Sequence, residues 1–314
     1  MASNQFSSGD VIADRRADYA RMLAESGDHA AAAELIEQAL ELAPLWTAGW
    51  FRLGEYSEKA GQAVKAVAAY EKVAGLDAEG IFAAELKLAV LGAAETPEQP
   101  PSRYVEGLFD DYADRFETSL VEKLGYSVPQ KLAALIEKAK PDSGGFRCIV
   151  DIGCGTGLLG TEINGWTGRL EGFDISANML AKAGEKGIYH HLAQADLSLA
   201  ADASGLFADG LAKGRADLVA AADVMMYLGS LDTVMPLVDA LLVTGGLFAF
   251  SVEDAIGEEG FVLQPSLRYA HSENYIRGLL AESGMDVLDV EKTTIRKDAG
   301  KPLSGILFLS RKRS

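Results

Sequence analysis

Three glycines at alternating positions follow an apolar run in the middle of the chain. The run covers residues 149–152, and Gly153, Gly155 and Gly157 come directly after it. This order predicts a buried strand, a tight loop and the start of a helix. Glycine lets the backbone approach a ligand closely, and the first N–H groups of the new helix would point at that ligand. Asp151, beside the loop, indicates that the ligand has a cationic or hydroxyl-bearing part.

Acidic residues also close the apolar runs that follow, at Asp174, Asp196 and Asp223. Ligands of open parallel sheets bind outside the carboxyl ends of the strands, so these acids and Asp151 could line one crevice. Carboxylates accept hydrogen bonds from hydroxyl and amino groups. For each acid, the competing interpretation is an exposed strand-end carboxylate or a helix cap.

The glycines alone fit two kinds of ligand. Gly155, Gly157 and Gly160 also satisfy G-x-G-x-x-G, the fingerprint of dinucleotide-binding proteins. Asp151 would repel a pyrophosphate and attract an α-amino group. The chain also ends in a predicted hairpin where a dinucleotide fold needs its second mononucleotide half. A dehydrogenase is therefore kept only as an alternative that NAD binding would support.

Strands and helices alternate from about residue 146, which predicts a parallel sheet covered on both faces. A helix is expected after Ser176, a typical N-cap residue. The expected strands cover residues 147–151, 170–173, 188–194, 218–222 and 247–251.

The last sixty residues have a different character. Residues 253–264 are rich in glycine and glutamate and predict a loop, and a helix is expected over 273–283. Two β-rich runs, 287–295 and 305–310, are separated by a turn at 297–300, which predicts a hairpin at the end of the sheet.

Residues 1–95 form amphipathic helices by their pattern, and they repeat. Gly27 and Gly61 are 34 positions apart, and Ala32 and Ala66 keep the same offset. This is the period of tetratricopeptide repeats. Such repeats bind partner proteins in a groove, but a helical cap on the main domain is an equal alternative.

Residues 96–145 are expected to be a linker followed by helices. Three prolines end any helix near the start of this segment. Tyr112 and Phe116 belong to an aromatic stripe beyond it, which either packs in a core or forms a lid over a pocket.

Composition excludes several classes of partner. The net charge of −17 repels phosphate backbones, so nucleic acid is not an expected ligand. No apolar run is long enough for a membrane span, and no secretory signal is visible, so a cytoplasmic location is expected. Cys148 and Cys154 are not spaced as a disulfide or a zinc site, and no acidic cluster predicts a metal.

Residues 104–314 resemble the class I S-adenosylmethionine-dependent methyltransferases, most closely predicted bacterial members with an N-terminal tetratricopeptide segment. The resemblance rests on residues 150–157, on 172–176 with Met179, on 195–197 and on 108–116. It implies an α/β fold over residues 146–314, with a Rossmann-like, seven-stranded, mostly parallel sheet that ends in an antiparallel hairpin.

The resemblance also assigns roles in binding S-adenosylmethionine. Gly153, Cys154, Gly155 and Gly157 would hold its methionine part, and Asp174 would chelate both ribose hydroxyls. The other positions that the resemblance assigns are Ile175 and Met179 over the adenine, Asp196 on its amino group, the Leu197 backbone on a ring nitrogen, and Asp223 facing the reacting groups.

The sequence signals for residues that would contact the methyl acceptor are less specific than those for the cofactor. Tyr112 and Phe116 could stabilise the sulfonium and exclude water. His271 could act as a base, and Arg268 could bind an acceptor carboxylate or be a surface residue. Tyr227 and Tyr269 are further candidates to contact the acceptor or the lid. Residues 224–227 lack the Asn/Asp-Pro-Pro-aromatic run of enzymes that methylate DNA or glutamine nitrogens.

We therefore expect a methyltransferase that acts on a small molecule. The alternatives are a protein methyltransferase whose helical repeats bind the polypeptide target, and a non-catalytic scaffold that binds S-adenosylmethionine.

Overall fold

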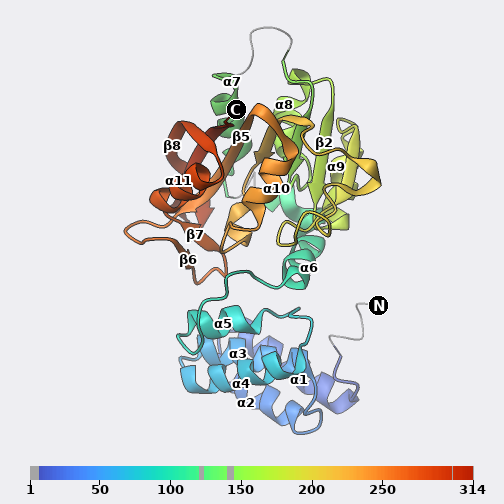
Figure 1. The fold of residues 1–314 in the computed structure, drawn as a ribbon. Helices are drawn as coiled ribbons and strands as arrows, with labels where there is room; N and C mark the ends of the chain where they lie inside the picture. Colours follow the sequence, from blue (N-terminus) through green and yellow to red (C-terminus); the bar gives the residue numbers. More distant parts are fainter. Residues whose placement is uncertain (1–6, 120–123, 140–144, 299, 314) are drawn as a thin grey trace. The chain divides into compact units, whose positions relative to one another are not determined.

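The computed structural model describes residues 7–119, 124–139, 145–298 and 300–313. It divides the chain into two compact units, Met1–Tyr104 and Val105–Ser314. Figure 1 shows that the first unit is helical and that the second combines helices with one sheet. In the described parts of the chain, no helix is both long and apolar enough to cross a membrane.

The first unit consists of helices that pack in consecutive pairs. Asp10 and Asp28 cap the first two helices, because their carboxylates accept backbone N–H groups of the first turn. Gly54 lies so close to the ring of Tyr70 that a Cβ there would be 2.4 Å from Cε1. The helices are α1 (Val11–Glu25), α2 (His29–Leu40), α3 (Thr47–Lys59), α4 (Ala63–Leu76) and α5 (Ala84–Val90).

The second unit contains a nine-stranded sheet in the order β3-β2-β1-β4-β5-β7-β6, with β9 paired to β5 and β8 to β9. The first five strands of this order are parallel to one another, whereas β9 is antiparallel to both β5 and β8. The first five strands along the chain are β1 (Ile149–Ile152), β2 (Leu170–Asp174), β3 (His191–Gln194), β4 (Ala216–Ala221) and β5 (Leu242–Asp254). The last four are β6 (Phe261–Leu263), β7 (Tyr269–His271), β8 (Met285–Asp298) and β9 (Lys301–Lys312).

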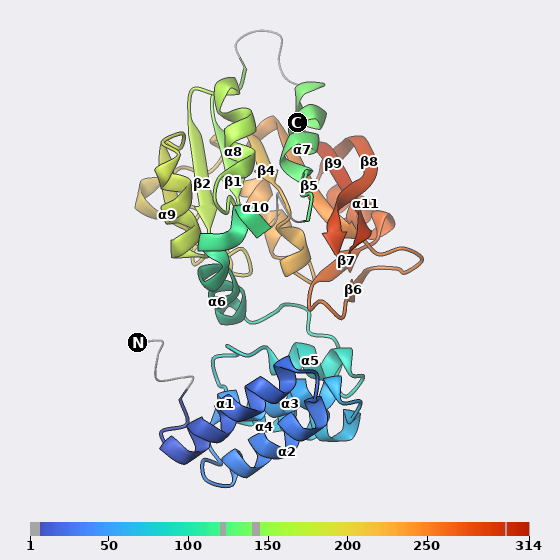
Figure 2. The same ribbon diagram turned by 180° about the vertical axis from the view of Figure 1, so that it is seen from behind.

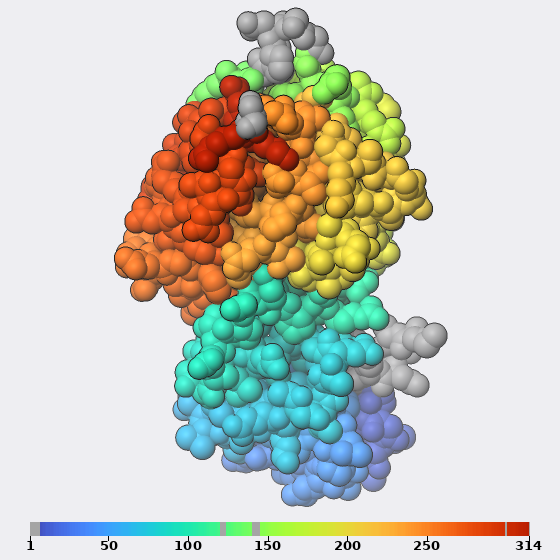
Figure 3. Space-filling view, viewed as in Figure 1, coloured from blue at the N-terminus to red at the C-terminus, as the bar shows by residue number. Residues whose placement is uncertain are grey.

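Helices cover both faces of this sheet. Figures 1 and 2 show α10 (Val234–Leu241) and α11 (Glu273–Glu282) on one face and α7 (Val128–Glu137) and α8 (Leu158–Ile163) on the other. Alternate residues of β1 follow this division: Val150 packs with the first pair of helices and Ile149 with the second. Helix α9 (Ala177–Glu185) packs against β2 and β3. In the space-filling view of the chain, the visible face of the second unit is formed largely by its yellow, orange and red segments (Figure 3).

The mostly parallel sheet, its terminal antiparallel hairpin and the N-terminal helical unit confirm the predicted α/β architecture, and the tetratricopeptide character of the helices stays a prediction. Ser176 caps α9 as expected, since its Oγ accepts the Met179 N–H at 3.0 Å. The predicted loop over 253–264 is wrong in part, because β5 continues to Asp254 and residues 261–263 form β6. A three-residue strand has too short a pattern to be recognised, and it forms here by pairing with β7. Together with β7, which also has three residues, this gives nine strands in the described part of the sheet instead of the predicted seven.

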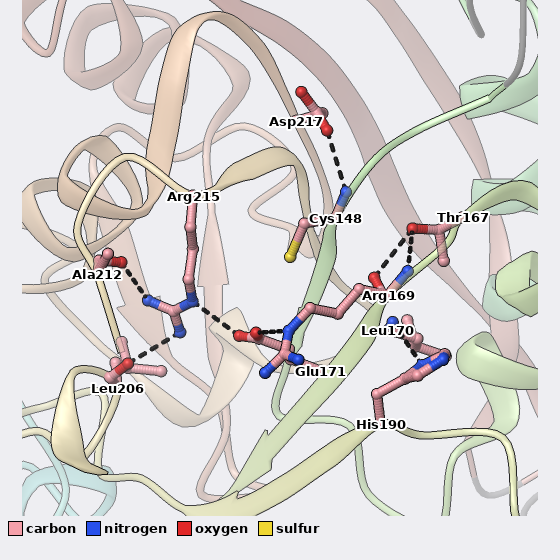
Figure 4. Close-up of polar contacts among 10 residues, drawn as sticks. All are labelled: Cys148, Thr167, Arg169, Leu170, Glu171, His190, Leu206, Ala212, Arg215 and Asp217. Carbon is pink, nitrogen blue, oxygen red and sulfur yellow. Dashed lines mark hydrogen bonds and ion pairs between the residues drawn. The ribbon is translucent and has the colours of Figure 1, made fainter. Parts of the chain in front are cut away.

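A buried ion-pair cluster lies on β2, as Figure 4 shows. The carboxylate of Glu171 is fully buried and accepts from Arg169 at 2.6 Å and from Arg215 at 2.7 Å. The Arg215 guanidinium also donates to the carbonyls of Leu206 and Ala212. This cluster joins β2 to the segment before β4 and so has a structural role.

Candidate active site

The glycine loop after β1 has a backbone that favours glycine at three positions. The φ angles of Gly153, Gly155 and Gly157 are +66°, +55° and +87°. A Cβ at Gly153 would lie 2.4 Å from Cγ2 of Val224, so the loop needs glycine there to pack against the segment after β4. At Gly155 no heavy atom lies within 4 Å of the Cβ position. The loop therefore has open space beside Gly155 where a ligand could lie against the backbone.

Asp174, at the end of β2, is tied to this loop. Its Oδ2 accepts the Gly155 N–H at 2.8 Å, and its Oδ1 accepts the Ser176 N–H at 2.9 Å. Burial raises the pKa of this carboxyl to about 6. Each oxygen keeps a second lone pair, so the carboxylate can still accept two ligand hydroxyls.

Asp151, on β1, carries a buried oxygen that has no partner in the described residues. Its side chain is 1% exposed. Oδ2 accepts the Tyr189 hydroxyl at 2.7 Å, whereas Oδ1 accepts no hydrogen bond. Burial raises the pKa of Asp151 to about 7. An unpaired buried acceptor is costly, and a cationic ligand group would satisfy it.

The remaining predicted cofactor residues lie at the neighbouring strand ends. Asp196 follows β3, and its Oδ1 accepts both the N–H and the hydroxyl of Ser198. Ile175 continues from Asp174, and its carbonyl accepts the Gln194 amide. Leu197 and Met179 are buried, and Met179 is fully so. The structure thus brings the predicted cofactor residues of β1, β2 and β3 to one edge of the sheet.

The aromatic segment before the sheet lies against this edge. Helix α6 (Ser102–Tyr112) contributes Asp110, whose carboxylate accepts the Ser176 hydroxyl at 2.6 Å. Glu117 accepts the Thr156 hydroxyl and the Lys186 ammonium, both at 2.7 Å. Two carboxylates therefore hold this segment to the glycine loop and to the start of α9.

Aromatic rings connect the same segment to the loop after β4. The ring of Phe109 is 4.8 Å from that of Tyr227 and 6.5 Å from that of Phe116. Tyr112 and Phe116 meet edge to face at 5.5 Å. The predicted residues Tyr112, Phe116 and Tyr227 therefore belong to one cluster, joined by Phe109. Burial raises the pKa of Tyr227 to about 12, so its hydroxyl stays protonated.

Asp223 follows β4 in a left-handed conformation with φ of +59°. Its N–H donates to the Ser251 hydroxyl at 2.8 Å. The buried guanidinium of Arg296, on β8, bridges the carboxylates of Asp223 and Glu253. Burial raises the pKa of Asp223 to about 6, although the charge of Arg296 opposes this. In this structure the carboxylate of Asp223 thus forms an ion pair with Arg296.

Two predicted acceptor residues lie at the start of β7: Arg268 precedes the strand and Tyr269 begins it. Arg268 donates to Glu253 at 2.7 Å and to Asp298 at 2.6 Å, so two carboxylates already pair with the group proposed to bind an acceptor. Tyr269 is fully buried.

His271 is also fully buried. Its Nε2 lies 2.8 Å from the carbonyl oxygen of Gly229. Burial lowers its pKa to about 4, so the imidazole is neutral and Nε2–H donates to that carbonyl. Its side chain contacts Gly229, Leu228, Phe261 and Tyr275, and among the described residues no contact with Asp151 or Asp174 is found. The structure thus does not bring His271 to the cofactor residues, and its role as a base stays a prediction.

A separate cavity of about 790 Å³ lies at the end of β5. Its lining combines acidic and apolar side chains and contains no residue of the glycine loop. It includes Glu253, Asp254, Glu258, Ile256, Val262 and Leu303.

Sequence reasoning missed Tyr189, Arg296 and Glu253. An isolated glycine inside a strand, such as Gly172, often marks a close approach, and this signal could have indicated Tyr189. For Arg296 there was no local signal, because its partner Asp223 is 73 positions away. Within the described residues, no group of three or more His, Cys, Asp or Glu could hold a metal ion.

In one class of α/β enzymes, the cofactor binds beside a glycine loop that joins a strand to a helix. A carboxylate at the end of the next strand completes this binding site. Residues 149–246 match the family model described as a methyltransferase domain. This part of the second unit therefore matches a methyltransferase domain, as predicted, and the unit shares its fold with solved S-adenosylmethionine-dependent enzymes such as those named next.

Solved structures that are similar to this chain include enzymes of different activities. The [4+2]-cyclase SpnF is 15% identical with a TM-score of 0.54, and the match covers 68% of this chain and 98% of SpnF. The 1,6-didemethyltoxoflavin-N1-methyltransferase of Burkholderia thailandensis, with 1,6-didemethyltoxoflavin and S-adenosylhomocysteine bound, is 16% identical with a TM-score of 0.51, covering 70% of this chain and 94% of that one. An S-adenosylmethionine-dependent methyltransferase from Mesorhizobium loti is 22% identical with a TM-score of 0.44, covering 57% and 96%. No curated protein sequence matches this chain.

Proposed function

We propose that this protein transfers the methyl group of S-adenosylmethionine to a small-molecule acceptor. The observation that carries the proposal is the unpaired, buried Oδ1 of Asp151 beside a glycine loop that Asp174 closes. Open space at Gly155 admits a ligand against the backbone. The acidic groups suit a ligand with an ammonium group at one end and ribose hydroxyls at the other.

The bound cofactor would supply an already activated methyl group, so the protein mainly has to align the acceptor and exclude water. Asp174 would hold the ribose hydroxyls, and the backbone of residues 153–157 and Asp151 would hold the amino-acid part. Tyr112, Phe116 and Tyr227 would exclude water through their shared cluster with Phe109. Asp196 and Ile175 lie at the adjoining strand ends, where an adenine would extend.

Two observations support a small acceptor. The Burkholderia thailandensis enzyme with this fold has a small heterocycle bound. The net charge of −17 disfavours nucleic acid. Calorimetric titration with S-adenosylhomocysteine tests the cofactor, and release of S-adenosylhomocysteine on incubation with pools of metabolites tests the reaction. A purified, folded protein with no measurable affinity for either form of the cofactor would refute the proposal.

A protein acceptor is the second candidate, and the helical unit favours it. Gly27 and Gly61 occupy equivalent turns 34 positions apart, with φ of +91° and +72°. We interpret α1–α2 and α3–α4 as two tetratricopeptide-like repeats that could bind a polypeptide. Deletion of residues 1–95 distinguishes the candidates: a metabolite methyltransferase keeps its turnover, whereas a protein methyltransferase loses affinity for its target.

The fold itself does not require methyl transfer, since SpnF is described as a [4+2]-cyclase. Stoichiometric cofactor binding without formation of S-adenosylhomocysteine would favour a non-catalytic role. We also propose a cytoplasmic location. It agrees with Cys148 and Cys154, which are buried and form no disulfide bond in the described structure.

A further inference from the structure

The side chain of Tyr189 lies in a slot that three glycines create. Gly172 of β2 is the register partner of Asp151 in β1, so both positions face the same side of the sheet. A Cβ at Gly172 would be 2.7 Å from Cε1 of Tyr189, and one at Gly160 of α8 would be 2.2 Å from its hydroxyl oxygen. A Cβ at Gly157 would be 3.0 Å from Cε2. The ring therefore fits between sheet and helix because these residues lack side chains.

The slot directs the Tyr189 hydroxyl to the carboxylate of Asp151, at 2.7 Å. In the described part of the chain, the ionisable groups that act on Asp151 come from several elements and include no cation: Tyr189 before β3, Cys154 in the glycine loop, Asp174 on β2 and Tyr126 before α7. One neutral donor thus holds Oδ2, and Oδ1 has no protein partner in the described chain. A carboxylate bonded through one oxygen cannot rotate freely, so the position of its second oxygen is set.

We propose that Tyr189 is a positioning residue, whose hydroxyl holds Asp151 so that Oδ1 is kept for the α-ammonium group of the cofactor. This inference rests on the proposed function. It also explains why residues 160 and 172 are glycines without any contact between them and the cofactor. Gly160 and Gly172 leave room for the ring of Tyr189, which orients Asp151.

The proposal predicts a specific dependence on pH. Burial raises the pKa of Asp151 to about 7, and the hydrogen bond from Tyr189 opposes that rise. An ammonium group binds the ionised carboxylate, so affinity should fall as the pH drops below about 7. Without the hydroxyl, the pKa of Asp151 rises further, and the loss of affinity should begin at a higher pH.

The test compares full-length wild type with Tyr189→Phe, which keeps the ring in its slot. Calorimetry between pH 6 and pH 9 would give the affinity for S-adenosylhomocysteine. We expect the variant to bind about tenfold more weakly at pH 7, which is typical of losing a hydrogen bond to a charged group, and to recover most of this loss at pH 9. Identical profiles, or an equal loss at every pH, would overturn the role of Tyr189.

A second ligand separates positioning from a general structural effect. Methylthioadenosine has the nucleoside of S-adenosylhomocysteine but no ammonium group, so its affinity should be unchanged in Tyr189→Phe. Gly160→Ala places a methyl group in the slot. Like Tyr189→Phe, it should weaken the binding of S-adenosylhomocysteine and leave the binding of methylthioadenosine unchanged. Equal weakening of both ligands in both variants would contradict the proposal.

Tyr70→Phe is the matched control, because it removes another buried hydroxyl that donates to a carboxylate, that of Glu58 in the helical unit. It should change neither the affinity nor its pH profile. If wild type itself fails to bind S-adenosylhomocysteine, the proposed function is rejected. If wild type and Tyr189→Phe bind alike at every pH, only the role of Tyr189 is rejected.

Discussion

The backbone N–H of Gly155 donates to the carboxylate of Asp174 at 2.8 Å, which joins the loop after β1 to the end of β2. The other oxygen of Asp174 accepts the N–H of Ser176, the residue that caps α9. One side chain thus organises the glycine loop, the strand end and the next helix. A change at Asp174 should therefore affect the whole cofactor side of the site.

Asp174→Asn should weaken binding of S-adenosylhomocysteine by about 10- to 100-fold. The amide has only one acceptor oxygen, and hydrogen bonds to a charged group contribute about 1.5–3 kcal/mol each. Isothermal titration calorimetry measures the change. Asp217→Asn is the control, because Asp217 also accepts backbone N–H groups, those of Arg147 and Cys148, but lies at the opposite end of the sheet. An equal loss in both variants would contradict a specific role.

Asp151→Asn should make the free protein more stable at pH 8 than wild type. The pKa of Asp151 is about 7 in the folded protein against an ordinary aspartate value of 3.8, so the folded state favours the protonated form. The resulting stabilisation is complete below 3.8 and is lost as the pH rises through 7. Asparagine never ionises, so its relative advantage should grow by up to about 4 kcal/mol between pH 4 and pH 8. Urea unfolding at both pH values checks this, and parallel shifts would argue against a buried, ionising Asp151.

Glu171→Gln should destabilise the second unit by about 3–5 kcal/mol without changing its affinity for the cofactor. The substitution leaves Arg169 and Arg215 without their buried carboxylate, and breaking a buried ion pair from one side is costly. Glu185→Gln removes a carboxylate from the exposed pair with Lys182 and should cost less than about 1 kcal/mol. Chemical denaturation compares the two variants, and similar losses in both would be inconsistent with this account.

Asp110→Ala should release the aromatic segment from the cofactor side of the site. Its carboxylate accepts the Ser176 hydroxyl, so its loss should lower the affinity for S-adenosylhomocysteine by about 3- to 10-fold. Hydrogen exchange over residues 105–117 should become faster. Asp111→Ala on the same helix is the control, since Asp111 is exposed. Unchanged exchange in Asp110→Ala would show that this carboxylate does not hold the segment.

Local pattern predicted the elements whose signals are contiguous in sequence. An apolar run followed by glycines with positive φ is a local requirement of the backbone, so β1, its loop and the start of α8 could be placed from the sequence. The acids at the ends of β2 and β4 were placed by the same reasoning. In contrast, β6 has three residues and forms only through β7, so no local pattern identified it.

The sequence by itself determined the helical first unit, the five strands β1–β5 along the chain and the acids at the ends of β1 to β4, because periodicity and glycine chemistry act over a few residues. Only the tertiary structure decided which charges meet. Tyr189 reaches Asp151 across 38 positions, and Arg296 reaches Asp223 across 73. Such pairs depend on strand register and helix packing, which bring together side chains whose partners no local pattern encodes. The roles of Asp151 and Asp223 therefore differ in the fold, although their positions in sequence look alike.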